Sequence, residues 1–252
     1  MIKNLKKDSL ERYSRQIILK NIGIIGQKKI INSKVLIIGA GGLGCPIADL
    51  LARSGIGLIG VMDYDKVSLS NIHRQTLYTT KDVGKYKVKV IKKKLNLINK
   101  EVKIKIYNQK ANEKNLINII NKYDVVVDGS DNFKTKFLLN KFSLIFKKKL
   151  IVGAISKFDG HIFVFDFNKK NTPCLKCFYQ TEPSDEFLNC ESEGILGSTA
   201  SIVGSLQANE VLKIILSIGG NLKSNILILD FLNLNFRKVL FKKRKSCICT
   251  KL

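Results

Sequence analysis

Short apolar runs alternate with amphipathic stretches along most of this 252-residue chain. β-branched apolar runs predict strands, and apolar positions that repeat every three or four residues predict the helices between them. Near the N-terminus we expect one or two helices within residues 9–31, with Ser9 as a possible cap. We further expect strands at 34–39, 58–65, 102–107, 124–128, 150–154 and 161–167, and helices at 43–54, 83–98, 112–122 and 132–146.

The pattern changes after Phe167, where proline, cysteine, glutamate and serine become frequent. Residues 168–194 therefore predict a long irregular loop, a kind of segment that usually serves function. A helix at about 198–218 should follow. Two last strands are expected at 225–230 and 234–241, and Asn233 between them predicts an antiparallel addition to the sheet.

The alternation of strand and helix predicts the fold class. It is typical of an α/β protein with a Rossmann-like, mostly parallel sheet, helices on both faces and antiparallel C-terminal strands. We expect a single domain over 1–252. Its parts would be N-terminal helices at 1–32, a nucleotide-binding core at 33–155, and a third part at 156–252.

Composition and charge narrow the location and the partners. The longest apolar runs are far shorter than the roughly 20 residues of a membrane helix, and no apolar stretch follows the first positive charges. We therefore expect a cytoplasmic protein without a membrane partner. The net charge of +24 attracts acidic partners, although a solvated lysine surface explains it as well. No stacking aromatics alternate with the basic residues, so we expect no nucleic-acid partner.

A glycine-rich turn follows the first predicted strand. In GAGGLG, Gly39, Gly41 and Gly44 match GxGxxG directly after a strand and before a helix, a context in which backbone amides hold phosphate, and Gly42 of the same turn is also a cofactor-binding candidate. Asp63 ends the next strand, where a carboxylate can accept hydrogen bonds from ribose hydroxyls. Nucleotide binding is the stronger interpretation, while a plain tight turn stays open. The glycines alone do not distinguish NAD from ATP.

The stretch after the second strand favours ATP. DYDKVSLSNIHRQTL places Asn71, Arg74 and Gln75 where the phosphates of a mononucleotide would lie. An arginine suits a polyphosphate because its planar fork binds two oxygens at once and stays charged. Nicotinamide chemistry does not need such a group.

Five motifs carry a resemblance to a known family: RYSRQ at 12–16, GAGGLG at 39–44, SLSNxxRQ at 68–75, VGKYK at 83–87 and SDN at 130–132. Over nearly its whole length the chain resembles the ThiF/MoeB/HesA adenylyltransferases, bacterial relatives of the ubiquitin-activating enzymes. It looks slightly nearer the molybdopterin-type members, such as MoeB. The resemblance implies adenylylation, by ATP, of the C-terminal glycine of a ubiquitin-like sulfur-carrier protein ending in Gly-Gly. The products are an acyl adenylate and pyrophosphate, in molybdopterin or thiamine biosynthesis.

The resemblance also implies roles for single residues. Asp63 would hold the ribose, while Asn71, Arg74, Gln75 and Lys87 would contact the triphosphate. The third part of the chain, 156–252, would bind the carrier, which could be MoaD-like or ThiS-like.

Two further roles follow from the resemblance. Asp131 would assist Mg²⁺ and the reacting centre, and the arginine matching Arg15 reaches into a neighbouring subunit's site, which implies a homodimer. Each role has a plainer alternative. Arg15 and Lys87 could be surface charges, and Asp131 could cap a helix.

Six cysteines in a chain that we expect to be cytoplasmic suggest metal or thiol chemistry, because disulfides are rare in that compartment. Cys174 and Cys177 form C-x-x-C, and Cys247 and Cys249 form C-x-C, so four thiolates could bind a structural Zn²⁺. The family usually has C-x-x-C twice, and the shorter pair would strain a shared tetrahedron. Free thiols are the alternative.

The other two cysteines differ from these four. Cys190, on the predicted loop, matches the family position that can become linked to the activated carrier, although an idle loop cysteine is also possible. Cys45 should only pack behind the glycine turn. The two histidines, His73 and His161, are not expected to be catalytic.

Two other function classes stay open: an NAD-dependent oxidoreductase, and a non-catalytic scaffold of the same fold. The chain has no rhodanese segment after Cys249, so we expect a separate protein to donate sulfur.

Overall fold

The computed structural model describes residues 5–183, 194–220 and 222–250. The helices are α1 (Lys7–Arg12), α2 (Ser14–Ile17), α3 (Gly23–Asn32), α4 (Gly44–Ser54), α5 (Lys87–Ile98), α6 (Glu113–Ile119), α7 (Phe133–Ile145), α8 (Leu175–Phe178) and α10 (Gly197–Leu216). The strands are β1 (Lys34–Ile38), β2 (Leu58–Met62), β3 (Lys103–Tyr107), β4 (Val125–Asp128), β5 (Lys149–Ser156), β6 (Asp159–Asp166), β7 (Asn225–Asp230) and β8 (Asn235–Leu240). Single 3₁₀ turns are η1 (Leu69–Asn71), η2 (Thr80–Asp82), η3 (Ile120–Lys122) and η5 (Ile248–Thr250).

The described strands form one eight-stranded sheet in the order β3-β2-β1-β4-β5-β6-β7-β8. The first five of these strands are parallel to their neighbours, and their 3-2-1-4-5 order is that of a nucleotide-binding α/β fold. From β5 onward each pairing is antiparallel. The expected fold class is confirmed. The antiparallel part, however, begins one strand earlier than predicted, because only two residues separate β5 from β6.

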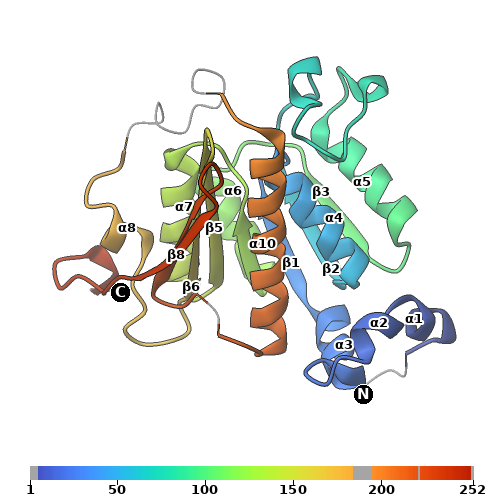
Figure 1. Ribbon diagram of the computed structural model, residues 1–252, viewed down its shortest axis with the longest axis horizontal. Helices are drawn as coiled ribbons and strands as arrows, with labels where there is room; N and C mark the ends of the chain where they lie inside the picture. The colour runs from blue at the N-terminus through green and yellow to red at the C-terminus, as the bar shows by residue number, and fades with distance from the viewer. Residues whose placement is uncertain (1–4, 184–193, 221, 251–252) are drawn as a thin grey trace.

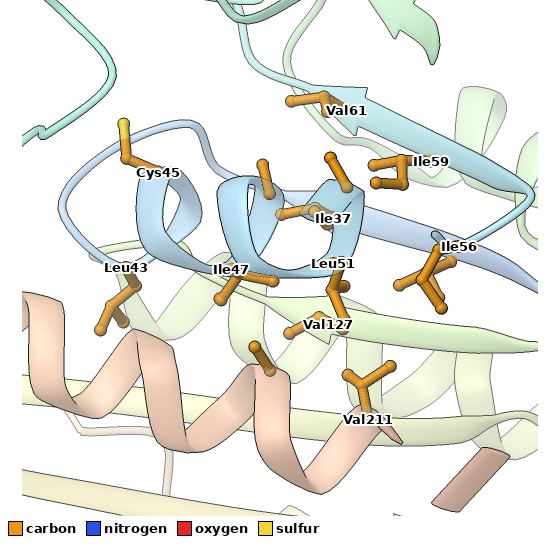
Figure 2. Packing of buried hydrophobic residues seen from close by; sticks show 14 of the residues in the cluster. Ile37, Leu43, Cys45, Ile47, Leu51, Ile56, Ile59, Val61, Val127 and Val211 are labelled. Atoms are coloured by element: carbon orange, nitrogen blue, oxygen red, sulfur yellow. The ribbon is translucent and has the colours of Figure 1, made fainter. Parts of the chain in front are cut away.

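Helices cover both faces of the sheet (Figure 1). Strand β1 shows why two cores form, since Val35 and Ile37 face one cluster of buried residues while Leu36 and Ile38 face the other. Helices α4, α5 and α10 pack over the first cluster, and α6 and α7 over the second. Figure 2 shows Ile47 and Leu51 of α4 lying toward α10, where Val211 packs.

Two predicted boundaries differ from the structure near the site. Strand β2 stops at Met62 rather than at residue 65, because the Asp63 carboxylate turns the chain by accepting a hydrogen bond from the Asp65 amide at 2.8 Å. Helix α5 begins at Lys87 rather than at residue 83, because Gly84 has a positive φ of 84° and Tyr86 is extended.

Within the part of the chain that the structure describes, every helix is too short or too polar to cross a bilayer. The division into three parts, 1–32, 33–155 and 156–252, stays a prediction.

Candidate active site

A cavity lies at the carboxyl ends of the parallel strands, where ligands bind in open α/β sheets. Segments far apart in the sequence converge on it: the glycine turn after β1, the loop after β2, the start of α5, the loop after β3 and the loop after β4. Its lining includes Gly39, Gly41, Gly42, Asp63, Tyr64, Asp65, Arg74, Gln75, Lys87, Gln109, Lys110, Gly129, Ser130, Asp131, Thr135, Lys136, Ala154 and Ile155.

The glycine turn leaves no room for side chains. Gly39 has a positive φ of 95°, and a Cβ there would come within 2.5 Å of the Gly129 carbonyl oxygen. A Cβ on Gly44 would overlap the Gly39 carbonyl oxygen. The backbone between them is held from two sides, because the Tyr78 hydroxyl donates to Ala40 O at 2.7 Å and Ala40 N donates to Asp63. Gly44 itself supports the turn from beneath rather than lining the cavity.

Asp63 connects the turn to the second strand. Its Oδ2 accepts from Ala40 N at 2.7 Å and its Oδ1 accepts from Asp65 N at 2.8 Å. Burial raises the pKa of this carboxyl group, while the positive charge of Lys87 opposes the rise. Each carboxylate oxygen has a lone pair left, so Asp63 can also accept from ribose hydroxyls.

Polar residues of the loop after β2 either line the cavity or hold the loop in shape. Arg74 lines the cavity and its Nη1 donates to Ser70 O at 2.9 Å. Gln75 is only 4% exposed, and among the described residues no donor reaches its Oε1. Asn71, in contrast, lies outside the cavity lining and accepts from Ser68 N at 3.2 Å in a capping box. The structure therefore gives Asn71 a loop-forming position.

Lys87 begins α5 and is 6% exposed, so the alternative that it is a surface charge is wrong. Its Nζ lies 2.9 Å from Asp65 Oδ2, and both residues line the cavity. Sequence reasoning missed Asp65. Its position in DYD, two residues after the ribose-binding candidate, was the available signal.

Asp131 lies exposed on the cavity rim, between β4 and α7. It does not cap the helix. The N-cap is Asn132, whose Oδ1 accepts from Thr135 N at 2.9 Å. The capping alternative for Asp131 is therefore wrong, and its carboxylate stays available to ligands in the cavity.

Lys136 is a cavity residue that sequence reasoning also missed. It is 1% exposed, and its Nζ donates to Asp128 Oδ2 at 3.0 Å, Ser130 O at 2.7 Å and Gly153 O at 2.6 Å. These bonds join α7, the end of β4, the following loop and β5 at one point. Lys136 thereby fixes the loop that carries Asp131.

Arg15 stands apart from this cavity. It is exposed on α2 and does not contribute to the cavity lining. Its role in a neighbouring subunit stays a prediction, as does the homodimer.

The four paired cysteines meet in a second location, near α8 and η5. All four are buried and their sulfur atoms lie within 4.8 Å of one another. Cys174 Sγ lies 3.6 Å from Cys247 Sγ, and Cys177 Sγ lies 3.5 Å from Cys249 Sγ. Tetrahedral Zn–S bonds of about 2.3 Å put sulfur atoms about 3.8 Å apart. The chemistry and the spacing of these donors fit Zn²⁺, and the short C-x-C pair takes its place in the cluster.

The other two cysteines and the two histidines do not belong to this cluster. Burial raises the pKa of Cys45 to about 12, and its thiol donates to Ala40 O at 3.5 Å, which fits the predicted packing role. Burial also lowers the pKa of His161. His73 is exposed beside Arg74. Cys190 lies outside the described residues.

Comparison with known proteins identifies the family. The ThiF family matches residues 13–250. This chain belongs to the ThiF family. It is 39% identical to the sulfur carrier protein adenylyltransferase of Thermus thermophilus, over 96% of this chain and 90% of that protein. It is 40% identical to the adenylyltransferase and sulfurtransferase MOCS3 of Anopheles gambiae, over 97% of this chain but only 55% of that protein.

Solved structures agree on the fold of this ThiF-family chain. E. coli MccB with MccA-N7isoASN superposes with a TM-score of 0.83 at 23% identity, covering 98% of this chain and 75% of that one. PaaA superposes with a TM-score of 0.81 at 24% identity, covering 96% of this chain and 76% of that one. The resemblance inferred from the five motifs is confirmed.

Proposed function

We propose that this protein adenylylates the C-terminal glycine of a ubiquitin-like sulfur-carrier protein, using ATP. One observation carries the proposal: a single cavity collects a glycine turn, a buried carboxylate at Asp63, two cations at Arg74 and Lys87, and a rim carboxylate at Asp131. The name and the 90% coverage of the Thermus relative support the carrier as the substrate.

The cavity suits a reaction between two anions. A carboxylate oxygen of the carrier would attack the α-phosphorus, the bond from that phosphorus to the bridging oxygen would break, and pyrophosphate would leave. Arg74 and Lys87 would offset the repulsion between carboxylate and triphosphate and the charge that develops on the leaving oxygens. The tight glycine turn would fix the nucleotide so that its α-phosphate faces the carboxylate.

Lys87 must change partner for this chemistry. Its Nζ pairs with Asp65, which is the more exposed partner with 45% of its side chain accessible. A triphosphate carries more charge than one carboxylate and could replace Asp65 as the partner of the Lys87 ammonium group. Because Asp65 is partly exposed, water could solvate its carboxylate after the ion pair breaks. We therefore assign Asp65 the task of holding Lys87 in place while no nucleotide is bound.

Mg²⁺ is part of the proposal. Asp131, with the Ser130 hydroxyl beside it on the cavity lining, offers the oxygen donors that this ion prefers. When bound, the ion would neutralise charge on the phosphates. Asp131 would orient it, and Lys136 would keep the Asp131 loop in position.

Other parts of the proposal rest on the resemblance and on the relatives' names. They are a homodimer that places Arg15 in the partner's site, a separate sulfur donor, a carrier-linked Cys190, a cytoplasmic location, and a role in molybdopterin or thiamine biosynthesis. The cysteine cluster would hold a structural Zn²⁺ and tie the segment around η5 to α8. An NAD-dependent oxidoreductase is disfavoured because Arg74 and Lys87 serve no purpose in hydride transfer.

ATP–pyrophosphate exchange tests the proposal directly. Purified protein with Mg²⁺ and Zn²⁺ is assayed with a MoaD-like and, separately, a ThiS-like carrier ending in Gly-Gly. We expect exchange that depends on one carrier, which also names the pathway. ATP binding without exchange on either carrier would favour the scaffold alternative.

Matched variants link the activity to the cavity. Arg74→Ala and Asp131→Ala should keep the fold and lose exchange by a factor of at least about 100, since single electrostatic groups contribute this much in comparable sites. Arg53→Ala is the control, because Arg53 is exposed on α4 and pairs only with Asp49 among the described residues. Wild-type exchange in Arg74→Ala or Asp131→Ala would contradict the assignment.

A further inference from the structure

A second cavity adjoins the nucleotide cavity at the loop after β3 and is lined by residues of α6, α7, α8 and η5. It encloses about 470 Å³, which lies within the range of about 300–1,000 Å³ that is usual for small-molecule sites. The assignments above give this cavity no role. Its lining is Lys110, Ala111, Asn112, Glu113, Lys134, Thr135, Phe137, Leu138, Asn140, Lys141, Leu144, Lys176, Glu182 and Ile248.

Large apolar side chains form part of this lining. Phe137, Leu138 and Leu144 of α7 contribute three of them, and Ile248 of η5 contributes a fourth that is 54% exposed. Lys176 Nζ lies 5.8 Å from the centroid of the Phe137 ring, so a cation stands directly over the apolar surface. A ligand with an apolar body would remove this surface from water and bind more tightly for it.

Basic side chains outnumber acidic ones around the cavity, with four lysines against two glutamates. One of each is already paired, because Lys141 Nζ lies 2.6 Å from Glu113 Oε1. Within the part of the chain that the structure describes, no acid pairs with Lys110, Lys134 or Lys176. The cavity therefore suits a ligand whose apolar body carries an anionic group.

A buried amide on the lining also has a donor to spare. Asn140 is 2% exposed, and its Oδ1 accepts from Leu175 N at 2.9 Å, which fixes the start of α8 against α7. Its Nδ2 donates no hydrogen bond to any described residue. Buried polar side chains normally have partners. A carboxylate or phosphate oxygen in the cavity would provide the missing acceptor.

The two cavities share part of their walls, since Lys110, Ala111 and Thr135 line both. Lys110 carries the charge of this shared wall. Its Nζ lies 5.5 Å from the centroid of the Tyr64 ring, which belongs to the nucleotide cavity. An anion in the second cavity would attract this ammonium group and would repel the phosphates of a bound nucleotide.

We propose that the cavity between α6, α7, α8 and η5 binds a small organic anion, with an apolar body and a phosphate or carboxylate group, and that this anion weakens ATP binding. Phe137 and Leu138 cover the apolar body. Lys176 and Asn140 bind the anionic group, and Lys110 couples the two cavities. The site itself does not depend on the proposed function, whereas the effect on ATP binding rests on it.

Calorimetric titration with 1-naphthyl phosphate tests the site, because this probe joins a flat apolar body to one phosphate group. The comparison probes are 1-naphthol and inorganic phosphate, each of which carries one half of that chemistry. The joined probe should bind more tightly than either. Lys176→Glu and Lys134→Glu should each weaken its binding by about fivefold or more, because charge reversal replaces an attraction by a repulsion.

The control separates the cavity from the general positive charge of the protein. Lys114→Glu makes the same charge change on α6, where Lys114 is exposed and outside the cavity lining. It should leave the affinity for the probe within about twofold of the wild type, because solvent and salt screen distant charges. Wild-type affinity in both Lys176→Glu and Lys134→Glu, or equal binding of 1-naphthol, would overturn the site.

ATP titrations at rising probe concentration test the coupling. The Kd for ATP should rise by about three- to fivefold, the effect of one exposed charge interaction, and then level off. Saturating ATP should raise the Kd of the probe by the same factor, because coupling between two sites is reciprocal. Lys110→Met should reduce the factor.

The results that would contradict the coupling differ from those that would contradict the proposed function. Unchanged ATP affinity with the probe bound would overturn the coupling. A rise in the Kd for ATP without a plateau would overturn it as well, since the probe would then compete inside the nucleotide cavity. A protein that binds the probe but no ATP would overturn the proposed function together with the coupling, and would leave the second site standing.

Discussion

Replacement of Lys136 by methionine should destabilise the protein by about 3–5 kcal/mol. The methionine keeps most of the length and the apolar stem of lysine, so the change chiefly removes the ammonium group. That group sits at 1% exposure against an Asp128 carboxylate at 0% exposure of its side chain. Without it, a buried charge loses its counterion and the carbonyls of Ser130 and Gly153 lose a donor.

The expected loss of stability depends on the hydrogen bonds that Asp128 keeps in the variant. Asp128 Oδ1 keeps its hydrogen bonds from Ser130 N at 2.9 Å and Ser130 Oγ at 2.6 Å, so the carboxylate is not left entirely without partners. Breaking a buried pair by removing one member typically costs 3–5 kcal/mol because the other charge stays buried. The double variant Lys136→Met, Asp128→Asn removes that charge and should recover about 1–2 kcal/mol.

Urea unfolding followed by circular dichroism measures these changes, because the chain contains no tryptophan for a fluorescence signal. Lys134→Met is the matched control: Lys134 lies two residues earlier on α7, is exposed, and should change stability by less than about 0.5 kcal/mol. A loss below about 1 kcal/mol in Lys136→Met, or no recovery in the double variant, would refute the reasoning.

Three more perturbations test separate features. Gly44→Ala should cost about 1–3 kcal/mol of stability, because the new Cβ would overlap the Gly39 carbonyl oxygen. It should also weaken ATP binding, so that ATP raises the unfolding temperature less than in the wild type; an unchanged rise would contradict the tight turn. Metal analysis should find about one zinc per chain, and Cys249→Ser should lose it with a lower unfolding temperature; less than about half a zinc in the wild type would argue for free thiols. ATP affinity should fall as the pH drops through the mildly acid range, and less steeply in Asp63→Asn. Burial raises the pKa of Asp63, so its ionised, accepting form exists above that pKa and is lost below it; equal slopes would exclude Asp63 as the ribose acceptor.

The central strands β1, β2 and β4 were predicted from continuous apolar runs, because each of them is buried on both faces of the sheet. The direction of β6 was missed, although its signal was present. A parallel connection needs a dozen or more residues, and the predicted strands at 150–154 and 161–167 left only six between them. The end of β2 and the start of α5 were misplaced, because a side-chain hydrogen bond at Asp63 and a positive φ at Gly84 set them, and neither shows in hydrophobic periodicity.

Some residues of the site could be predicted from the sequence and others could not. Gly39, Asp63, Arg74 and Asp131 lie in motifs that can be recognised in a linear sequence, and the structure brings them to one cavity. Lys136 could not be found, because in FKTKF it looks the same as the exposed Lys134. Only the fold shows which of the two lysines turns inward.

The residues that line the nucleotide cavity have a further consequence, which concerns the order of synthesis. All of them lie between Ile38 and Ile155, within the continuous stretch that forms β1 to β5. Cys247 and Cys249, in contrast, leave the ribosome more than seventy residues after Cys174 and Cys177, their partners in the cluster. We therefore expect the nucleotide-binding half to gain structure on the nascent chain, while the cysteine cluster closes last. Cellular ATP would then meet a formed cavity before the cysteine cluster beside α8 is complete.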